Sequence, residues 1–269
     1  MSALAETAHA KINLALHVRG KLDDDYHRIE TIYAFCEDGD QLSGDEAPSL
    51  SLKLSGEFGP ALSGRENLVT KAAEALCEAQ GIDRGAALEL EKRVPVASGI
   101  GGGSADAAAA LRLLNGLWDL GLPLERLEEI GRTLGADVAA CVASQTTLGE
   151  GKGDALKPLQ LNIAGTPVLL VNPRVQLATS EVFASWDGID RGPLEDWRDG
   201  RNDLQAAATS LAPQIDGVLA WLMAQPGAWC VRMSGSGATC FALFDSEAAR
   251  DHAAMAIPRE WWSLPTRLR

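Results

Sequence analysis

The sequence predicts a protein of mixed strands and helices that form two packed lobes with a cleft between them. Up to about residue 160, segments with a two-residue apolar period alternate with segments of helical apolar spacing. Beyond that point the organisation changes to a short buried strand, a loop-rich stretch and a strand–turn–strand unit. With 269 residues, 46% of them hydrophobic, the chain is long enough to bury a substantial core.

The first part of the chain opens on a strand. In residues 10–18 the apolar side chains, such as Ile12 and Leu14, alternate with polar ones, such as Lys11 and Asn13, which predicts a half-buried strand. Further strands are predicted over 29–35, 50–56 and 86–94, and helices over 66–80, 104–118 and 124–134. Turn chemistry marks residues 148–154.

In the second part of the chain, proline and loop-forming residues separate the predicted helices and strands. Proline ends a short buried strand over 166–173, and the stretch 185–203 reads as loop. Helical apolar spacing runs over 203–224, and residues 229–244 read as strand, tight turn and strand. A last helix is expected around 246–256.

Charge, cysteine content and apolar patterning limit the partners and the location of the protein. A net formal charge of −13 disfavours a nucleic-acid surface, which needs a basic stripe, but it allows a small anionic ligand in a locally positive cleft. The five cysteines form no CxxC pair and lie beside apolar residues, which indicates reduced, structural thiols. The chain has neither a secretory signal pattern nor an apolar run of ~18 residues. We therefore expect a cytoplasmic protein without a membrane partner.

A glycine-rich segment is the strongest candidate for a binding site. Gly99, Gly101, Gly102 and Gly103 precede a helix that is expected to begin near Ser104. Glycines let a backbone approach a ligand closely, and free N–H groups at a helix N-terminus attract anions. The segment matches neither the Walker A motif nor the dinucleotide fingerprint. The alternative is a flexible strand-to-helix turn, but so many glycines would cost considerable conformational entropy for a turn alone.

Three weaker signals each have a structural alternative. Asp137, after Gly135 and before an apolar run, is either a helix N-cap or a catalytic carboxylate. Lys11 is either a solvated lysine or part of a site. The segment Ser234–Thr239, with two glycines between two strand-like runs, is either a hairpin turn or a ligand-binding loop.

The order of these motifs resembles that of the GHMP kinase superfamily. AKINLALHV, KRVPVASGIGGGSADAAAAL, LGADVAACV and RMSGSGATCFALF follow one another from about Ala8 to about Phe244, nearly the whole chain. The AKINL opening and the pair Tyr26–His27 resemble the branch that acts on a CDP-linked alcohol. Homoserine kinase and the mevalonate-pathway kinases share the glycine loop but not that opening.

The resemblance implies a fold of two lobes. An α/β N-terminal lobe over 1–160 would bind ATP and contain a left-handed βαβ crossover, against the usual right-handed rule. A smaller, ferredoxin-like α+β lobe over 161–269 would lie on the substrate side.

The resemblance also implies roles for residues that match the motifs. Asp137 would be the general base and Lys11 its partner, with Asn13 on the same strand face as a substrate-binding residue. The glycine loop, Gly99, Gly101, Gly102, Gly103 and Ser104, would wrap the ATP phosphates.

Five further positions match ligand contacts of the superfamily's cytidine branch. Tyr26 and Phe183 would clamp the cytosine ring, and His27 would read its edge. Asn67 and Lys92 would contact the adenosine part of ATP.

The chain departs from the family pattern at three places. Asp25 stands where glycine usually precedes the Tyr-His pair, and it adds negative charge close to the expected anionic ligand. Ala105 replaces the second serine of the glycine loop, so Ser104 carries the only hydroxyl there. Residues 174–182 lack the prolines that are common in that loop.

The implied reaction is transfer of the γ-phosphoryl group of ATP to the 2-hydroxyl of the methylerythritol portion of a CDP-linked substrate, a step of the non-mevalonate isoprenoid route. Mg²⁺ would accompany ATP, held by phosphates and water rather than by protein ligands. An aspartate beside a lysine would be a weak base that accepts the proton late. We expect a monomer or homodimer. The alternatives are another GHMP kinase and a nucleotide-binding regulator without activity.

Overall fold

The computed structural model describes residues 4–24 and 26–269, so the departure at Asp25 lies outside the described residues. The chain forms two compact units that interleave along the sequence. Unit 1 comprises the chain up to Ala10, then Asp38–Val96 and Gly101–Ser144. Unit 2 comprises Lys11–Glu37, Ala97–Ile100 and Gln145–Arg269. The division into an ATP-binding lobe over 1–160 and a substrate-side lobe over 161–269 concerns function and stays a prediction.

Two long paired strands, β1 (Leu4–Lys21) and β2 (His27–Ala47), run through both units. They confirm the strands predicted over 10–18 and 29–35 but extend well beyond them. The expectation of a half-buried strand is wrong, because Lys11 and Asn13 are as buried as Ile12. Polar side chains tolerate such burial when they find hydrogen-bond partners, and Asn13 donates to the Thr31 hydroxyl at 2.7 Å.

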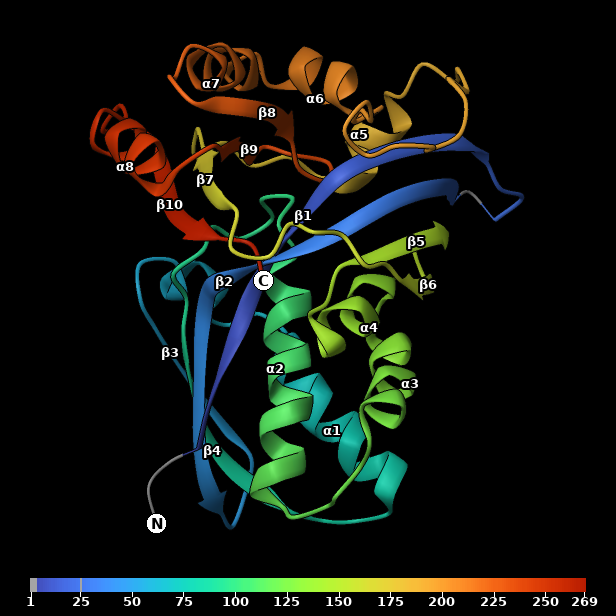
Figure 1. Cartoon of the computed structure of the whole chain (residues 1–269). Coiled ribbons are helices and arrows are strands. Elements are labelled where there is room, and N and C mark those ends of the chain that lie inside the picture. The colour runs from blue at the N-terminus through green and yellow to red at the C-terminus, as the bar shows by residue number, and fades with distance from the viewer. Residues whose placement is uncertain (1–3, 25) are drawn as a thin grey trace. The chain divides into compact units, whose positions relative to one another are not determined.

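Unit 1 consists of a sheet with helices gathered beside it (Figure 1). Strand β4 pairs parallel with β3 and antiparallel with the second half of β2. The helices pack on one another, α1 on α2 and α3 on α4. The elements of unit 1 that follow β2 are β3 (Ser51–Ser55), the 3₁₀ helix η1 (Gly59–Leu62), α1 (Leu68–Gln80), β4 (Gly85–Glu91), α2 (Gly102–Leu117), α3 (Leu124–Leu134) and α4 (Ala136–Ala143).

Helix α1 shows how the sequence sets these elements. The Asn67 side chain accepts a hydrogen bond from the Val69 N–H at 2.8 Å and caps the helix N-terminus. Gly81 ends the helix in the left-handed conformation, as the sequence predicts. The buried residues recur at helical spacing and face α2, whose own buried face is largely alanine, so the two helices approach closely.

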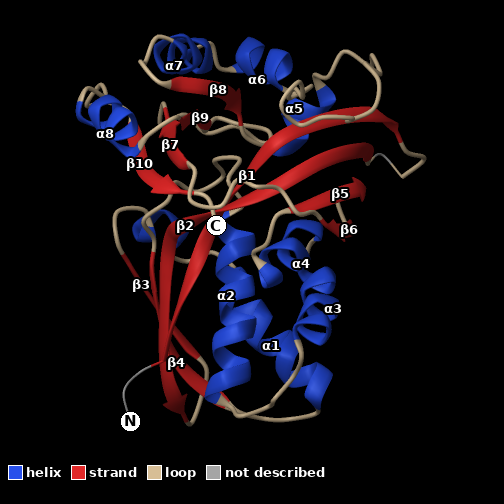
Figure 2. Ribbon diagram, in the orientation of Figure 1, coloured by secondary structure: helices blue, strands red, loops and turns tan. Residues whose placement is uncertain are grey.

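Unit 2 contains a four-stranded antiparallel sheet in the order β10–β7–β9–β8, with helices α7 and α8 packed on it (Figure 2). A hairpin, β5 and β6, pairs with the first half of β2 through β5. The elements of this unit that follow β2 are β5 (Thr147–Gly151), β6 (Ala155–Pro158), β7 (Pro167–Asn172), α5 (Thr179–Ala184), α6 (Gln205–Leu211), α7 (Gln214–Met223), β8 (Ala228–Met233), β9 (Cys240–Phe244), α8 (Glu247–Met255) and β10 (Trp262–Arg267).

Three points of the sequence prediction need correction. The helix expected over 203–224 is broken into α6 and α7 at Ala212–Pro213, because proline cannot continue a helix from the preceding turn. The turn chemistry of 148–154 belongs to the β5–β6 hairpin, of which only the tip is turn. Helix α4 and strand β10 are absent from the prediction, the latter because Pro265 interrupts its apolar pattern.

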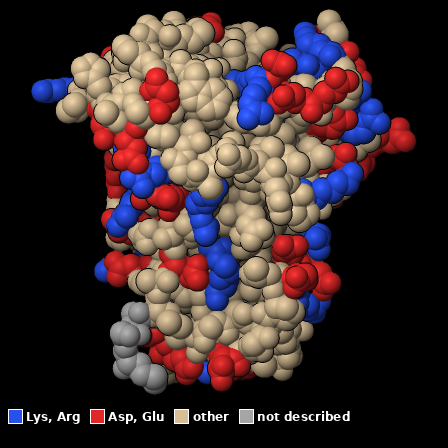
Figure 3. Space-filling view, viewed as in Figure 1, with Lys and Arg blue, Asp and Glu red and all other residues tan. Residues whose placement is uncertain are grey.

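Charge is mixed on the face of the molecule that Figure 3 shows. There basic and acidic side chains lie interspersed among uncharged ones instead of forming a basic stripe. Within the described residues, none of the helices has the length and apolar character that crossing a membrane requires.

Candidate functional site

The glycine loop has the backbone geometry of an anion site. Gly99 and Gly101 have φ of 79° and 66°, values that favour glycine. Helix α2 begins at Gly102, two residues before the predicted start, and no side chain caps it. The first N–H groups of such a helix have no intrahelical partner and carry the positive end of its dipole. They form a ready site for a phosphate.

The turn Ser234–Thr239 supports this loop from within unit 2. A side chain on Gly99 would place its Cβ 2.4 Å from the Ser234 carbonyl oxygen and 2.7 Å from that of Gly237. The Ser234 hydroxyl donates to the Gly99 carbonyl at 2.8 Å, and the Thr239 N–H donates to the Ser98 carbonyl at 3.1 Å. The segment is a turn between β8 and β9, as the hairpin alternative holds, and it also fixes the shape of the glycine loop.

A buried ionic cluster lies beneath the first turn of α2 in unit 1. The Lys92 ammonium donates to Asp40 and, at 2.8 Å, to Asp106, and all three side chains are at most 3% exposed. Asp40 also accepts the N–H groups of Arg93 at 2.6 Å and Val94 at 2.9 Å. The cluster therefore joins β2, the segment after β4 and α2 at the base of the glycine loop.

Burial and pairing shift the protonation of this cluster. Burial alone lowers the pKa of Lys92, but the carboxylates of Asp106 and Asp40 raise it above its usual value. Burial raises the pKa of Asp106 to about 8, against the opposing charge of Lys92. A Cβ on Gly102 would lie 3.2 Å from the Lys92 Nζ, so the ammonium is directly under the loop. The contact of Lys92 with adenosine stays a prediction.

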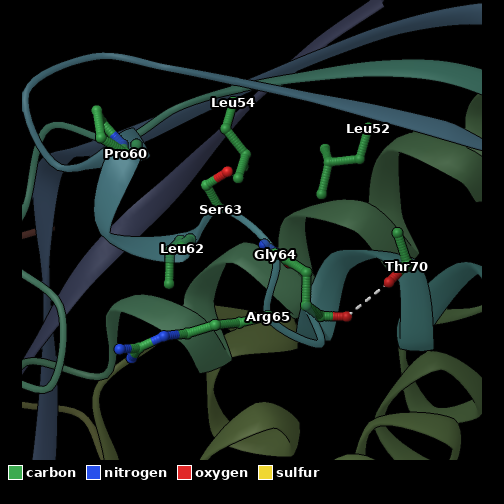
Figure 4. Close-up of a pocket in the computed structure, with 10 residues that line it drawn as sticks. Leu52, Leu54, Pro60, Leu62, Ser63, Gly64, Arg65 and Thr70 are labelled. Carbon is green, nitrogen blue, oxygen red and sulfur yellow. Dashed lines mark hydrogen bonds between the residues drawn. The ribbon is translucent and has the colours of Figure 1, made fainter.

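A cavity of about 610 Å³ opens beside α1 in unit 1. Figure 4 shows Leu52 and Leu54 extending from β3 toward the loop that carries Ser63 and Arg65. Asn67 also lines the cavity; because its Oδ1 caps α1, its amide hydrogens are the groups it can offer a ligand. The full lining is Leu52, Leu54, Gly59, Pro60, Leu62, Ser63, Gly64, Arg65, Asn67 and Thr70.

Helix α1, whose Thr70 lines the cavity, also packs on α2. Leu68 follows Asn67, and its Cδ1 would lie 3.5 Å from a Cβ built on Gly103. A ligand with an aromatic base in this cavity would therefore lie beside the helix that packs on α2. The size and the mixed lining suit a nucleoside.

Lys11 and Asn13 belong to a buried polar network in unit 2. The Lys11 ammonium donates to the Asn13 Oδ1 at 3.2 Å, and the Asn13 amide donates to Thr31 at 2.7 Å. The Asn13 N–H donates to the Ser234 hydroxyl at 3.1 Å. The Lys11 Nζ also lies 4.8 Å from the centroid of the Tyr33 ring. Lys11 is 4% exposed, so the alternative of a solvated lysine is wrong.

Asp137 lies in the first turn of α4 in unit 1. The N-cap of this helix is Gly135, with no side-chain capping bond, so the N-cap alternative for Asp137 is wrong. Lys11 belongs to unit 2, and its partnership with Asp137 stays a prediction.

Aromatic side chains gather around His27 in unit 2. The ring centroids of His27 and Phe183 are 4.9 Å apart, and Trp186 meets His27 edge-on at 5.6 Å. Burial, and then the charge of Lys21, lower the pKa of His27. The ring is therefore neutral at neutral pH and carries one donor and one acceptor nitrogen.

Tyr26 stands apart from this stack. It is 61% exposed, and the Lys152 Nζ lies 4.2 Å from its ring centroid. The clamp between Tyr26 and Phe183 stays a prediction. Sequence reasoning missed Trp186 and Lys152; the only signal for Trp186 is an aromatic residue three positions after Phe183.

The fold and the glycine loop point to a class of protein. Residues 67–145 match the model of the GHMP kinases N terminal domain, and residues 187–263 match that of the GHMP kinases C terminal domain. A mevalonate kinase of Methanococcus jannaschii has the same fold, with a TM-score of 0.73 at 11% identity over 100% of this chain and 99% of that one.

Closer relatives narrow the class. The 4-diphosphocytidyl-2-C-methyl-D-erythritol kinase of Rhizorhabdus wittichii is 52% identical over 98% of this chain and 94% of its own length. That of Novosphingobium aromaticivorans is 51% identical over 99% and 93%. A crystal structure of 4-(cytidine 5'-diphospho)-2C-methyl-D-erythritol kinase gives a TM-score of 0.85 at 32% identity, covering 98% of this chain and 99% of that one. The chain belongs to the 4-diphosphocytidyl-2-C-methyl-D-erythritol kinase family of GHMP kinases.

Proposed function

We infer that the chain phosphorylates the 2-hydroxyl of 4-diphosphocytidyl-2-C-methyl-D-erythritol with ATP, giving the 2-phosphate and ADP in the non-mevalonate isoprenoid route. It is a small-molecule kinase of its family. Among the geometric features, the stack of a neutral His27 on Phe183 is the observation that most favours a cytidine-linked substrate. Its donor and acceptor nitrogens suit the edge of a cytosine, which offers an amine and a ring nitrogen.

The residues of unit 1 fit ATP. The uncapped N-terminus of α2 offers backbone N–H groups to the phosphates, and no side chain of Gly101, Gly102 or Gly103 obstructs it. The cavity beside α1 would take the base against Leu52 and Leu54, which line it. We propose that the phosphates bind at Gly99–Ser104 and that Asn67 contacts the adenosine part.

We propose that Mg²⁺ enters with ATP. Within 4–24 and 26–269, no group of three or more His, Cys, Asp or Glu side chains is arranged to hold a metal. The ion would be held chiefly by phosphate oxygens and water, with the Ser104 hydroxyl oxygen as the ligand from the loop's side chains. It would neutralise phosphate charge. Ala105 lies on the buried face of α2, so the missing serine hydroxyl would have faced the packed side of the helix.

The proposed chemistry needs positioning and charge neutralisation more than covalent catalysis. Asp137 would accept the proton of the 2-hydroxyl as the phosphoryl group arrives. Lys11 would stabilise the negative charge that develops on that oxygen. Asn13, fixed by Thr31 and Ser234, would hold the Lys11 ammonium in place. A cytoplasmic location and a monomeric or homodimeric state stay predictions.

Thermal unfolding with added nucleotides tests this function. CDP should raise the melting temperature and uridine diphosphate should not, because His27 reads the cytosine edge. The Asp137→Ala variant should bind ATP as the wild type does and show no turnover. Wild-type turnover in that variant would remove Asp137 from the mechanism. Absence of any shift with CDP would point to a GHMP kinase for another alcohol.

A further inference from the structure

A tryptophan just beyond α5 contacts the ring that is proposed to read cytosine. The Trp186 ring meets His27 edge-on with centroids 5.6 Å apart, and Phe183, three positions earlier, lies against His27 at 4.9 Å. We propose that Trp186 is a positioning residue, which holds the His27 ring in the orientation that selects cytidine over uridine. This inference deepens the proposed function and rests on it.

Ring contacts are what orient His27. In the part of the chain that the structure describes, neither ring nitrogen of His27 is hydrogen-bonded, so both can bind a ligand. An imidazole without a hydrogen bond turns easily about its last side-chain torsion, whose energy well is broad. Phe183 lies at 33° to the imidazole plane and Trp186 at 86°, so the two rings restrict this rotation from different directions. Without Trp186, the Phe183 contact alone would set the orientation.

The chain holds Trp186 in place from both sides. The Trp186 N–H donates to the Phe183 carbonyl at 3.2 Å, which continues the last turn of α5. Farther along, the Leu194 N–H donates to the Glu30 carboxylate on β2 at 2.7 Å, and β2 is the strand that begins at His27. The Trp186 side chain also packs against the apolar core of unit 2. Trp186 therefore has a fixed position from which it can orient the His27 ring.

The indole N–H of Trp186 has no role in packing. Its Nε1 is buried, and none of the described residues accepts a hydrogen bond from it. A buried donor without a partner destabilises the folded state. Leucine or phenylalanine would supply apolar packing without that donor. Tryptophan is thus a poor residue here for stability alone, and its edge-on contact with His27 gives it a different purpose.

The competing role for Trp186 is to fill the core of unit 2. Loss of a core side chain lowers the melting temperature and weakens every ligand that binds the folded chain. Loss of a positioning residue weakens only the ligand whose recognition needs His27. The two roles therefore differ in whether CDP, uridine diphosphate and ATP are affected alike.

Binding of these three nucleotides to the full chain separates the roles. We expect Trp186→Leu to weaken CDP about fivefold, as for loss of one aromatic pair, and to leave ATP within about twofold. The affinity for uridine diphosphate should stay unchanged, so the ratio of the two affinities should fall by the same factor. Trp186→Met, whose flexible side chain fills irregular space, should behave like Trp186→Leu. Trp186→Phe keeps a ring and should restore most of the preference for CDP.

The matched control is Trp261→Leu. Trp261 also packs against the core of unit 2, and its ring meets Trp221 edge-on at 5.9 Å. The same chemical change at this place should leave the ratio of the affinities for CDP and uridine diphosphate unchanged.

The protonation of His27 gives a second measurement. Burial, and then the charge of Lys21, lower the pKa of His27. Because Trp186→Leu removes a ring that covers the imidazole, the pKa of His27 measured by NMR should rise toward its usual value. In Trp261→Leu it should not change. A core-filling role for Trp186 would leave the pKa of His27 where it is in both variants.

Other outcomes overturn the proposal. Equal losses for CDP, uridine diphosphate and ATP, together with a lower melting temperature, would assign Trp186 to core packing. An unchanged ratio of the affinities for CDP and uridine diphosphate would remove Trp186 from substrate selection. Absence of any preference for CDP in the wild type would instead contradict the proposed function itself. The melting temperature of each variant without ligand shows that it is folded.

Discussion

Two regions that we propose to bind ligands, one in each unit, are built in opposite ways. In unit 1 the region proposed to bind phosphate, the phosphate end, rests on Asp40, Lys92 and Asp106, whose side chains are at most 3% exposed. In unit 2 the region proposed to bind cytidine, the nucleoside end, presents Tyr26 and Lys152 at the surface, and an exposed ion pair with Asp24 holds Lys152. A phosphate site gains from donors fixed before the ligand arrives. A base-reading site made of exposed side chains can adjust to its ligand.

The contrast has an energetic side. Removing one partner from a buried ion cluster leaves an uncompensated charge, which destabilises a protein strongly. Removing an exposed pair changes the free energy of unfolding little. Substitutions at the phosphate end should therefore reduce stability, and those at the nucleoside end should reduce binding alone.

The largest effect is expected at Lys92. Lys92→Met leaves the buried acidic side chains of Asp40 and Asp106 without a cation and should lower the free energy of unfolding by about 3–5 kcal/mol. Urea unfolding measures it. Lys53→Met is the matched control, because Lys53 forms an exposed pair with Glu89 and should change the value by at most about 1 kcal/mol. Similar small decreases in the free energy of unfolding in both variants would show that the buried and the exposed charges contribute alike to stability.

The next effect is expected at Gly99. Gly99→Ala combines a left-handed φ of 79° with a Cβ that would overlap the Ser234 carbonyl. We expect a loss of about 1–3 kcal/mol in stability, together with weaker ATP binding. Gly121→Ala separates the two causes, because Gly121 has φ of 63° and no atom within 4 Å of the added Cβ. Equal behaviour of the two variants would mean that the turn Ser234–Thr239 does not fix the loop.

A smaller effect concerns pH and Asp106. The raised pKa of about 8 means that the folded chain holds this proton more tightly than the unfolded chain, whose carboxyl has a pKa near 3.8. The stability that protonated Asp106 contributes is therefore complete below the pKa of 3.8 in the unfolded chain. It is lost as the pH rises through the folded pKa of about 8. Relative to the wild type, Asp106→Asn should gain stability between about pH 5 and about pH 8. A pH-independent difference in urea unfolding would contradict this assignment.

The smallest effect on stability is expected at Tyr26. Tyr26→Ala should change the free energy of unfolding by no more than about 0.5 kcal/mol, because the ring is mostly exposed. The same change should raise the KM for the cytidine substrate far more than that for ATP, since a stacked base contributes about 1–3 kcal/mol. Equal changes in both KM values would exclude the clamp.

Local patterns predicted much of this architecture. The stop of α1 at Gly81 and the position of the glycine loop before α2 follow from neighbouring residues, and the structure confirms them. The cluster under the loop could not be foreseen, because Asp40 lies 52 positions from Lys92. Pairing over that distance depends on the register of β2 and β4. The pairing of Lys152 with Asp24, 128 positions apart, is of the same kind.

The burial of polar residues was the second feature that could not be predicted from the sequence. Strand alternation indicated that one face of residues 10–18 is solvated, whereas hydrogen bonds to Asn13 allow both faces to be buried. A short helix such as α4 has too few turns to show a period, which is why Asp137 could not be separated from an N-cap.

The release of ADP in the presence of different alcohols tests the central claim most directly. The account predicts rapid release of ADP with 4-diphosphocytidyl-2-C-methyl-D-erythritol and none above background with homoserine or mevalonate. Phosphorus NMR of the product should show a new phosphate ester at the 2-position. Release of ADP with homoserine or mevalonate in place of the cytidine substrate would contradict the account.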